Sequence, residues 1–535
     1  MLKKSYATWI LVLALICFFP FLGGVHLFDW DEINFAEIAR EMILSNDYLR
    51  PTINFEPFWE KPPLFIWFQA ISFHIFGIND YAARFPNAIA GVFTLLFLYF
   101  AGKKLHNKEF GLWWALAYFG SILPHLYFRS GIIDPWFNFF IFLGIYYFYR
   151  YKSEGKKSLM VFLSGLFIGL AVLTKGPVAL GLFGIVFAVV YLFTKFKNFI
   201  SFKHLIIWLL TFVGINAIWY GVETILHGPW FVTQFVLYQI RLFMIPDAGH
   251  GGFFGYHFVV LLFGCFPASA FALPALLNRN TSLYENGGRE SFLFLQKVLL
   301  LTVLIVFSIV TTKIVHYSSL AYFPLTYLAA SEIQRLIKNK IPLHLISKIL
   351  LPFTAVIFSI ALLALPVLFP YKNEFLHLIG DVQARMALEQ IELSFSWWNY
   401  IPGLLIIATI GIAHYIYKVA PIQSLRLLFL GSGFTVALAL YAFIGKIESF
   451  SQGTAIEIFE EHAGKTINVF GYKSYAHLYY GKVTHTMPKA DDPNFKGEMI
   501  VVAKANSRNE INERFPEWIL LKEKAGFLVY KKPAQ

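Results

Sequence analysis

The chain has 535 residues, of which 57% are hydrophobic and 14% charged, and its mean hydropathy is +0.60. This composition excludes a soluble globular protein, because the chain contains many apolar runs near the roughly 20 residues that cross a bilayer. The net charge of +12 does not indicate a nucleic-acid partner, since the lysines fall in short clusters between the apolar runs. The two cysteines, Cys17 and Cys265, lie inside apolar runs, which argues against a disulfide framework or a cysteine metal site.

In chain order, the apolar runs predict a polytopic helical membrane protein with about thirteen spans. A shorter apolar stretch at 64–76 is interpreted as a juxtamembrane helix in the outer interface, because it is too short to span and would reverse the orientation of every later loop. The predicted spans are 8–28, 85–102, 110–128, 135–150, 158–174, 177–194, 204–222, 253–277, 293–312, 317–334, 347–369, 397–417 and 425–445.

Lysine and arginine clusters fall on one side of these spans, and the positive-inside rule makes that side and the N-terminus cytoplasmic. An odd number of spans then places the C-terminus on the outer side. We divide the chain into a membrane domain, 1–445, whose first outer loop is 29–84, and a soluble domain, 446–535. Alternating apolar segments in the second part predict a small α/β domain, interpreted as a docking or packing cap. The basic clusters lie at 103–108, 150–157, 195–203 and 335–348.

The first outer loop concentrates charged residues beside the membrane. Apolar residues recur at helical spacing from Asp31 to Ser45, so an amphipathic helix is expected on the outer surface. Three acids stand at its start, where one would suffice for capping and for the helix dipole. In the segment Glu60-Lys61-Pro62-Pro63, the prolines restrict the backbone and hold an acid and a base over the membrane surface.

Further charged residues from separate loops also map to the outer ends of the predicted helices. Each one alone could be an interfacial side chain or half of a structural ion pair, but their convergence on one face favours a site. Carboxylates can orient an attacking hydroxyl or bind a divalent cation, and Lys and Arg can hold a phosphate, so a lipid-phosphate substrate is predicted. These residues are Arg84, Arg129, Asp134, Lys175, Arg241, His250 and Lys313.

The order of these motifs resembles the bacterial branch of the protein O-mannosyltransferase superfamily, which includes the aminoarabinose transferases that modify lipid A. The resemblance implies a GT-C fold with amphipathic juxtamembrane helices in the first outer loop and a small C-terminal α/β periplasmic domain. It also implies a polyprenyl-phosphate-sugar donor. The motifs are Asp31-Glu32, Glu60-Lys61-Pro62-Pro63, Arg84-Phe85-Pro86, Asp134-Pro135, Lys175-Gly176-Pro177 and Lys313.

The resemblance also implies roles for individual residues. Asp31 would be the main catalytic carboxylate, supported by Glu32 and Asp134. Lys61 would bind the donor phosphate, with Arg241, Lys175 and Lys313 as further contacts to the phosphate or the lipid head group. Glu60 and His250 match positions that can hold a divalent ion (Zn, Mg or Mn), and no organic cofactor is implied.

These features predict a membrane-bound hexosyl- or pentosyltransferase in the bacterial inner membrane, working on its periplasmic face. The segment 313–319 departs from the pattern of lipid A transferases, so the acceptor stays open between a lipid A-like lipid, another glycan and a protein. A transporter or flippase of lipid-linked sugars is the main alternative, although it would need charges or broken helices near mid-bilayer. A non-catalytic assembly subunit would leave the acidic first loop unexplained.

Overall fold

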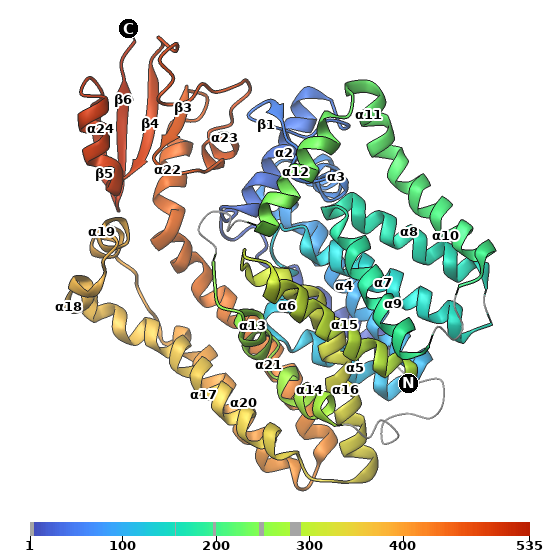
Figure 1. Ribbon diagram of the computed structural model, residues 1–535. Helices are drawn as coiled ribbons and strands as arrows, with labels where there is room; N and C mark the ends of the chain where they lie inside the picture. Colours follow the sequence, from blue (N-terminus) through green and yellow to red (C-terminus); the bar gives the residue numbers. More distant parts are fainter. Residues whose placement is uncertain (1–4, 156, 196–199, 245–250, 279–289, 535) are drawn as a thin grey trace.

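A computed structural model describes residues 5–155, 157–195, 200–244, 251–278 and 290–534. A body of long helices forms most of the molecule, and a small sheet domain lies at one end of it, beside the first outer loop (Figure 1).

The first half of the helical body runs from α1 to α12, and the second half runs from α13 to α21. The first set is α1 (Tyr6–Phe18), α2 (Asp31–Ser45), α3 (Leu64–Phe76), α4 (Asp80–Leu105), α5 (Lys108–Phe119), α6 (Ile122–Tyr127), α7 (Asp134–Ser153), α8 (Ser158–Lys175), α9 (Val178–Phe193), α10 (Phe202–Asn216), α11 (Val222–His227) and α12 (Trp230–Met244). The second set is α13 (Tyr256–Gly264), α14 (Ala268–Leu277), α15 (Glu290–Ile309), α16 (Tyr322–Asn339), α17 (Leu345–Leu368), α18 (Lys372–Phe375), α19 (Val382–Gln390), α20 (Ile401–Tyr417) and α21 (Pro421–Glu448).

Seven helical stretches in the described residues are long and apolar enough to cross a membrane, and four shorter helices are also apolar. A multi-pass membrane protein is therefore confirmed. Twelve of the thirteen predicted spans are filled by one helix or by consecutive helices. The first, 8–28, is wrong in its second half: α1 ends at Phe18, before Pro20 and the glycines Gly23 and Gly24, and residues 19–28 form turns and irregular structure outside the helix. Among the helices that fill predicted spans, α7 and α16 carry charged residues near their ends and are not among the seven. The seven stretches are Asp80–Leu105, Ser158–Lys175, Phe202–His227, Phe292–Ile309, Leu345–Leu378, Trp397–Tyr417 and Pro421–Glu461.

Two predicted spans are broken into helix pairs. The span 110–128 divides into α5 and α6 after Gly120, where a Cβ atom would lie 2.7 Å from the carbonyl oxygen of Phe429 on α21. The span 253–277 divides into α13 and α14 at Pro267, which has no N–H to continue a helix. The sequence also missed α12, which lies in a segment predicted to be an outer loop.

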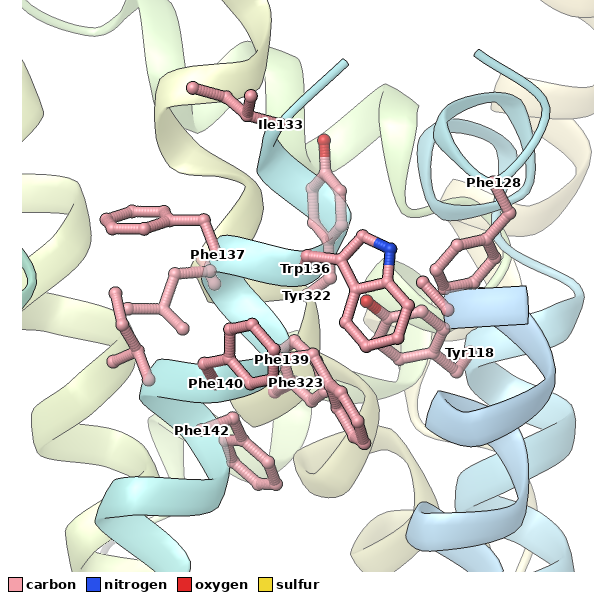
Figure 2. Close-up of a cluster of buried hydrophobic side chains, with 14 of the residues drawn as sticks. Tyr118, Phe128, Ile133, Trp136, Phe137, Phe139, Phe140, Phe142, Tyr322 and Phe323 are labelled. Atoms are coloured by element: carbon pink, nitrogen blue, oxygen red, sulfur yellow. The ribbon is translucent and has the colours of Figure 1, made fainter. Parts of the chain in front are cut away.

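Aromatic side chains pack around α7 and form the centre of the helical body. Figure 2 shows Phe137, Phe139, Phe140 and Phe142 of α7 beside Phe323 of α16. The rings of Phe142 and Phe323 are stacked, with centroids 4.4 Å apart and planes inclined by 16°. Such ring pairs add to the stabilisation from apolar burial and fix the packing of α7 against α16.

The helix α2 has the predicted position in the sequence but is not exposed on the surface as expected. All residues from Glu32 to Met42 are buried. The polar face is covered by the C-terminal domain, because Arg40 pairs with Glu37 at 2.7 Å and donates a hydrogen bond to the carbonyl oxygen of Val483 at 2.6 Å. Burying this pair against the second domain satisfies its donors, so the helix does not need water on that side.

The C-terminal part begins with the π-helical turn η8 (Ser449–Gly453) and α22 (Thr454–Glu461), which continue the line of α21. A four-stranded sheet follows in the order β3-β4-β6-β5, with β3 and β4 parallel and the other pairs antiparallel. The small α/β domain predicted from the alternating segments is thus present. The elements are β3 (Ile467–Phe470), α23 (Ala476–Tyr480), β4 (Met499–Lys504), α24 (Arg508–Arg514), β5 (Ile519–Lys524) and β6 (Phe527–Lys532); a separate hairpin, β1 (Thr52–Ile53) and β2 (Glu56–Pro57), lies in the first outer loop.

Candidate functional site

Two aspartates, a lysine and a histidine from four separate elements meet at the outer end of the helical body. The Nζ atom of Lys175 donates a hydrogen bond to Oδ1 of Asp134 at 2.7 Å. The Nε2 atom of His316 lies 3.8 Å from Oδ2 of Asp134 and 3.8 Å from Oδ2 of Asp31. Two of the three predicted catalytic carboxylates, Asp31 and Asp134, therefore lie beside one imidazole ring.

Local helix geometry explains why these residue types stand at these positions. Asp31 and Asp134 begin α2 and α7, and Pro135 directly follows the second aspartate, where its missing N–H costs nothing. Lys175 closes α8. Acids at helix N-termini and a base at a helix C-terminus are favoured by the helix dipole. The dipoles explain each charge alone, whereas their convergence comes from the packing of the helices.

The two aspartates differ in how a substrate can reach them. The side chain of Asp31 is 32% exposed, whereas that of Asp134 is 3% exposed. Within the described residues, Oδ2 of Asp134 has no hydrogen-bond partner, although Oδ1 is held by Lys175. Asp31 is thus the carboxylate that an incoming group can approach from solvent, and Asp134 presents one oxygen towards the same space as His316.

Lys61 is electrostatically coupled to this cluster. Burial lowers the pKa of the Lys61 ammonium below its ordinary value of 10.5, and Lys175 acts in the same sense. The neighbouring carboxylates of Glu60, Asp31 and Asp134 oppose this shift. A partly desolvated ammonium beside carboxylates and a second ammonium is suited to holding an anionic group that would complete its charge balance.

His316 belongs to the cluster although it was not among the predicted site residues. It lies on the short 3-10 helix η4 (Val315–Ala321), between α15 and α16. Burial lowers the pKa of His316 below its ordinary value of 6.5, and Asp134 opposes this shift. Its position three residues after Lys313, in a predicted outer turn, was the available signal, but a single histidine beside an aromatic residue indicated little.

Glu32 faces away from the cluster and holds the base of the site together. Its carboxylate forms a two-point pair with Arg84, with nitrogen–oxygen distances of 2.9 and 2.8 Å, and accepts hydrogen bonds from the backbone N–H groups of Phe28 and Gly131. Burial alone would raise the pKa of Glu32, but Arg84 holds it below its ordinary range. The predicted catalytic support from Glu32 is therefore indirect, through the placement of the adjacent Asp31.

The other predicted cations differ in their surroundings. Arg241, on the exposed side of α12, lies 5.4 Å from the ring of Tyr238, and Lys61 lies 5.2 Å from the same ring. Arg241 is thus near the cluster. By contrast, Lys313 donates hydrogen bonds to three carbonyl groups at the end of α15, those of Phe307, Ser308 and Val310, and so caps that helix. Its predicted phosphate contact is not supported by this arrangement.

Of the two residues predicted to bind a metal ion, Glu60 and His250, the structure describes only Glu60. Glu60 directly precedes Lys61 in the first outer loop, and His250 lies outside the described residues. In the part of the chain that the structure describes, no group of three or more His, Cys, Asp or Glu side chains is arranged to hold a metal ion. The two ammonium groups among the carboxylates would also repel a cation, so no step below is derived through a metal.

Comparisons with known proteins show what this chain is similar to. A family model for dolichyl-phosphate-mannose-protein mannosyltransferases matches residues 60–219. An undecaprenyl phosphate-alpha-4-amino-4-deoxy-L-arabinose arabinosyl transferase from Wigglesworthia glossinidia brevipalpis is 27% identical over 65% of the chain, and the match spans 62% of that relative. A transferase of the same name from Pectobacterium carotovorum is 27% identical over 75% of the chain and 74% of its own length.

Among solved structures, ArnT from Cupriavidus metallidurans bound to undecaprenyl phosphate superposes with a TM-score of 0.79. The two chains are 18% identical, and the superposition covers 98% of each. The GT-C membrane fold predicted from the motifs is therefore confirmed, as is the resemblance to the aminoarabinose transferase-like proteins of that fold.

Proposed function

We propose that this GT-C membrane protein is a glycosyltransferase that takes a sugar from an undecaprenyl-phosphate-type donor. The acceptor would be a lipid A-like lipid, or another glycan or a protein. One observation carries the proposal: Asp31, Asp134 and Lys175 from three helices and Lys61 from a loop converge on one site at the outer end of the helices. The names of the relatives and the fold of ArnT support the same donor class.

The charges of the site suit the two parts of a sugar transfer, which are the departure of the donor phosphate and the attack of the acceptor hydroxyl. The bond between the anomeric carbon and the phosphate oxygen breaks, and Lys61 and Lys175 stabilise the negative charge left on the departing phosphate. A phosphate is a sufficiently weak base to leave without a general acid. The bond from the acceptor oxygen to the anomeric carbon forms on the opposite face, which inverts that carbon.

The acceptor hydroxyl must lose a proton as it attacks. Asp31 is the partly exposed carboxylate, and it can accept that proton or orient the hydroxyl. Asp134 has one oxygen bound to Lys175, so its role is to hold that ammonium in place and to line the site. The ring of His316 lies between the two carboxylates, with Nε2 3.8 Å from an oxygen of each.

We place the reaction on the periplasmic face of the bacterial inner membrane. The charged cluster lies at the end of the helices away from the basic loops, and the positive-inside rule assigns those loops to the cytoplasm. A transporter of lipid-linked sugars fits less well, because the site residues stand at helix ends rather than along a path through mid-bilayer.

Reconstituted transfer tests the proposal directly. The protein is placed in nanodiscs with undecaprenyl-phosphate aminoarabinose and lipid A, and products are identified by mass spectrometry. The wild type and the control Asp29→Asn should add a sugar to lipid A, whereas Asp31→Asn should lose transfer at least ~100-fold, the lower end for a general base. Near-normal turnover in Asp31→Asn would contradict the assigned role. Translocation of the donor without transfer to lipid A, to envelope glycans or to secreted proteins would favour the transporter.

A further inference from the structure

A groove of about 450 Å³ lies between α14, α17, α20 and α21, away from the charged cluster. The helix α20 packs against both α17 and α21 along one edge of the helical body (Figure 1). The lining runs from Lys348 to Val356 on α17 and includes the last turns of α20 and the first turns of α21. Because α17 and α21 begin, and α20 ends, beside the predicted cytoplasmic loops, the groove belongs to the basic end of the helical body.

The size of the groove matches one leaflet of a membrane. The stretch from Lys348 to Val356 is about 12 Å long at the rise of an α-helix, and half of the hydrocarbon core of a bilayer is about 15 Å deep. Gly411 of α20 leaves room in the groove, since a Cβ atom built there would meet nothing within 4 Å. The groove opens to the outside of the helical body, because Val356 and Ile407 in its lining are each 45% exposed.

The buried polar side chains of the groove are already hydrogen-bonded. The hydroxyl of Ser424 donates to the carbonyl oxygen of Ala413, and that of Tyr417 donates to the carbonyl oxygen of Ile341 at 3.4 Å. Within the described residues, no buried side-chain nitrogen or oxygen of the lining lacks a partner. Most of the remaining lining is apolar. A space of this kind gives water few partners, and it suits a hydrocarbon chain.

Basic side chains stand where the groove reaches the basic end. Lys348 and His414 are part of the lining, and both are exposed. No Asp or Glu occurs in the stretches 341–371 and 401–446, which contain α17, α20 and nearly all of α21. An ammonium and an imidazole at the mouth of an apolar groove can both donate hydrogen bonds to a phosphate.

Neighbouring acids do not cancel this charge. Glu332 of α16 forms a two-point pair with Arg335, at 2.8 and 2.6 Å, so this acid already has its own cation. In addition, α17 and α21 begin at this end, and the positive dipole ends of helices attract anions. Basic pockets between helices on the cytoplasmic side of membrane proteins bind anionic lipid head groups for these reasons.

We infer that this groove binds an anionic phospholipid from the leaflet at the basic end, with one acyl chain inside the groove and the phosphate at Lys348 and His414. The polyprenyl-phosphate donor fits less well, because its phosphate is assigned to Lys61 and Lys175 at the other end of the helices. A second copy of the chain also fits less well. Two copies in one membrane would bring their Lys348 side chains together on this face, and like charges at an interface repel.

Native mass spectrometry of the full-length protein tests the groove without using sugar transfer. The protein in detergent is titrated with phosphatidylglycerol or with phosphatidylcholine of the same acyl chains, and the two Kd values are compared. The wild type should bind phosphatidylglycerol about five-fold more tightly, as expected for one lysine beside an anionic head group.

Filling the groove should prevent binding of the acyl chain. Gly411→Leu should weaken phosphatidylglycerol binding at least ~10-fold, because the new side chain takes the place of several methylene groups. Leucine also favours a helix more than glycine does, so the variant should fold. Gly184→Leu on α9 is the matched control and should bind like the wild type, because a Cβ atom at Gly184 also meets nothing within 4 Å and Gly184 does not line the groove.

Removing the lysine charge tests the head group. Lys348→Gln should abolish the preference for phosphatidylglycerol, whereas Lys103→Gln should keep it, because Lys103 is exposed in another basic loop and does not line the groove. Equal binding in Gly411→Leu and Gly184→Leu, or a wild type without preference, would overturn the inference. Displacement of phosphatidylglycerol by undecaprenyl phosphate would give the groove to the donor instead, and a dimer lost in Gly411→Leu would give it to a second copy.

Discussion

Lys175 Nζ lies 2.7 Å from Asp134 Oδ1, and this pair joins the last residue of α8 to the first residue of α7 at the outer surface. The side chains are 14% and 3% exposed, so each charge depends on the other for its solvation. A buried ion pair costs the protein most when a single partner is removed. The pair can therefore be tested for stability and for catalysis in the same set of variants.

Asp134→Asn and Lys175→Met should each destabilise the protein by about 3 kcal/mol, because each leaves one buried charge without its partner. The double variant should recover most of that stability but none of the activity, since the second ammonium of the site is absent. Thermal unfolding in detergent and transfer assays measure the two effects. A double variant as unstable as the single variants would show that the pair is not the source of the loss.

The rate of sugar transfer should depend on pH through the protonation of Lys61. Burial holds its pKa below the ordinary value of 10.5, and only the ammonium form stabilises a departing phosphate. Activity should therefore fall as pH rises through this lowered pKa. Lys61→Arg should move that alkaline limb to higher pH, because a guanidinium stays charged. Rates across pH 7–11 with saturating donor provide the measurement, and an identical alkaline limb in Lys61→Arg would contradict the assignment.

The sequence predicted the helices and the individual charges of the outer cluster because both depend on local signals. Long apolar runs mark helices whatever their partners, and charges such as Asp31 and Lys175 are conspicuous at the ends of apolar runs. Boundaries were predicted less well where tertiary contacts decide them. The end of α5, for example, depends on the close approach of Gly120 to Phe429, which no local pattern indicates.

The roles of individual charged residues within the site could not be predicted from the sequence. Glu32 follows Asp31 directly, but neighbouring residues on a helix point about 100° apart, so only one of them faces the cluster. Whether a lysine side chain is free to bind a substrate phosphate also depends on the fold. Lys313 is occupied by carbonyl groups at the end of α15, whereas His316, three residues later, enters the site. The predicted metal role of Glu60 and His250 stays a prediction.

Removing the charge of Asp31 should reduce activity but not stability, whereas removing the charge of Glu32 should reduce stability. Glu32→Gln removes the charge that compensates buried Arg84, and it should lower the free energy of unfolding by about 3 kcal/mol. Asp31→Asn should leave stability nearly unchanged, because its carboxylate is partly exposed, while transfer is lost. Thermal unfolding and residual turnover of the folded fraction separate the two. A Glu32→Gln protein with wild-type stability but no transfer activity would contradict this prediction and show that Glu32 takes part in the chemistry directly.

The docking of the C-terminal region should depend on pH through His26. Its Nδ1 atom contacts the carboxylate of Glu448 at the end of α21, and its backbone N–H donates to the same oxygen at 3.0 Å. The hydrogen bond with Glu448 raises the pKa of His26 above 6.5, and Asp80 and Glu460 act in the same sense. A raised folded-state pKa stabilises the protein fully below the unfolded value, and that stabilisation is lost as pH rises through the folded value.

The melting temperature of the wild type should therefore fall by about 2 °C more than that of His26→Gln as pH rises from 6 to 9. The glutamine keeps a hydrogen-bonding side chain but carries no titrating charge, which makes it the matched control. Scanning calorimetry of the full-length protein in detergent at several pH values measures the difference. Parallel pH profiles for the two proteins would show that His26 does not contribute to this dependence, and a steeper fall in His26→Gln would reverse the sign of the argument.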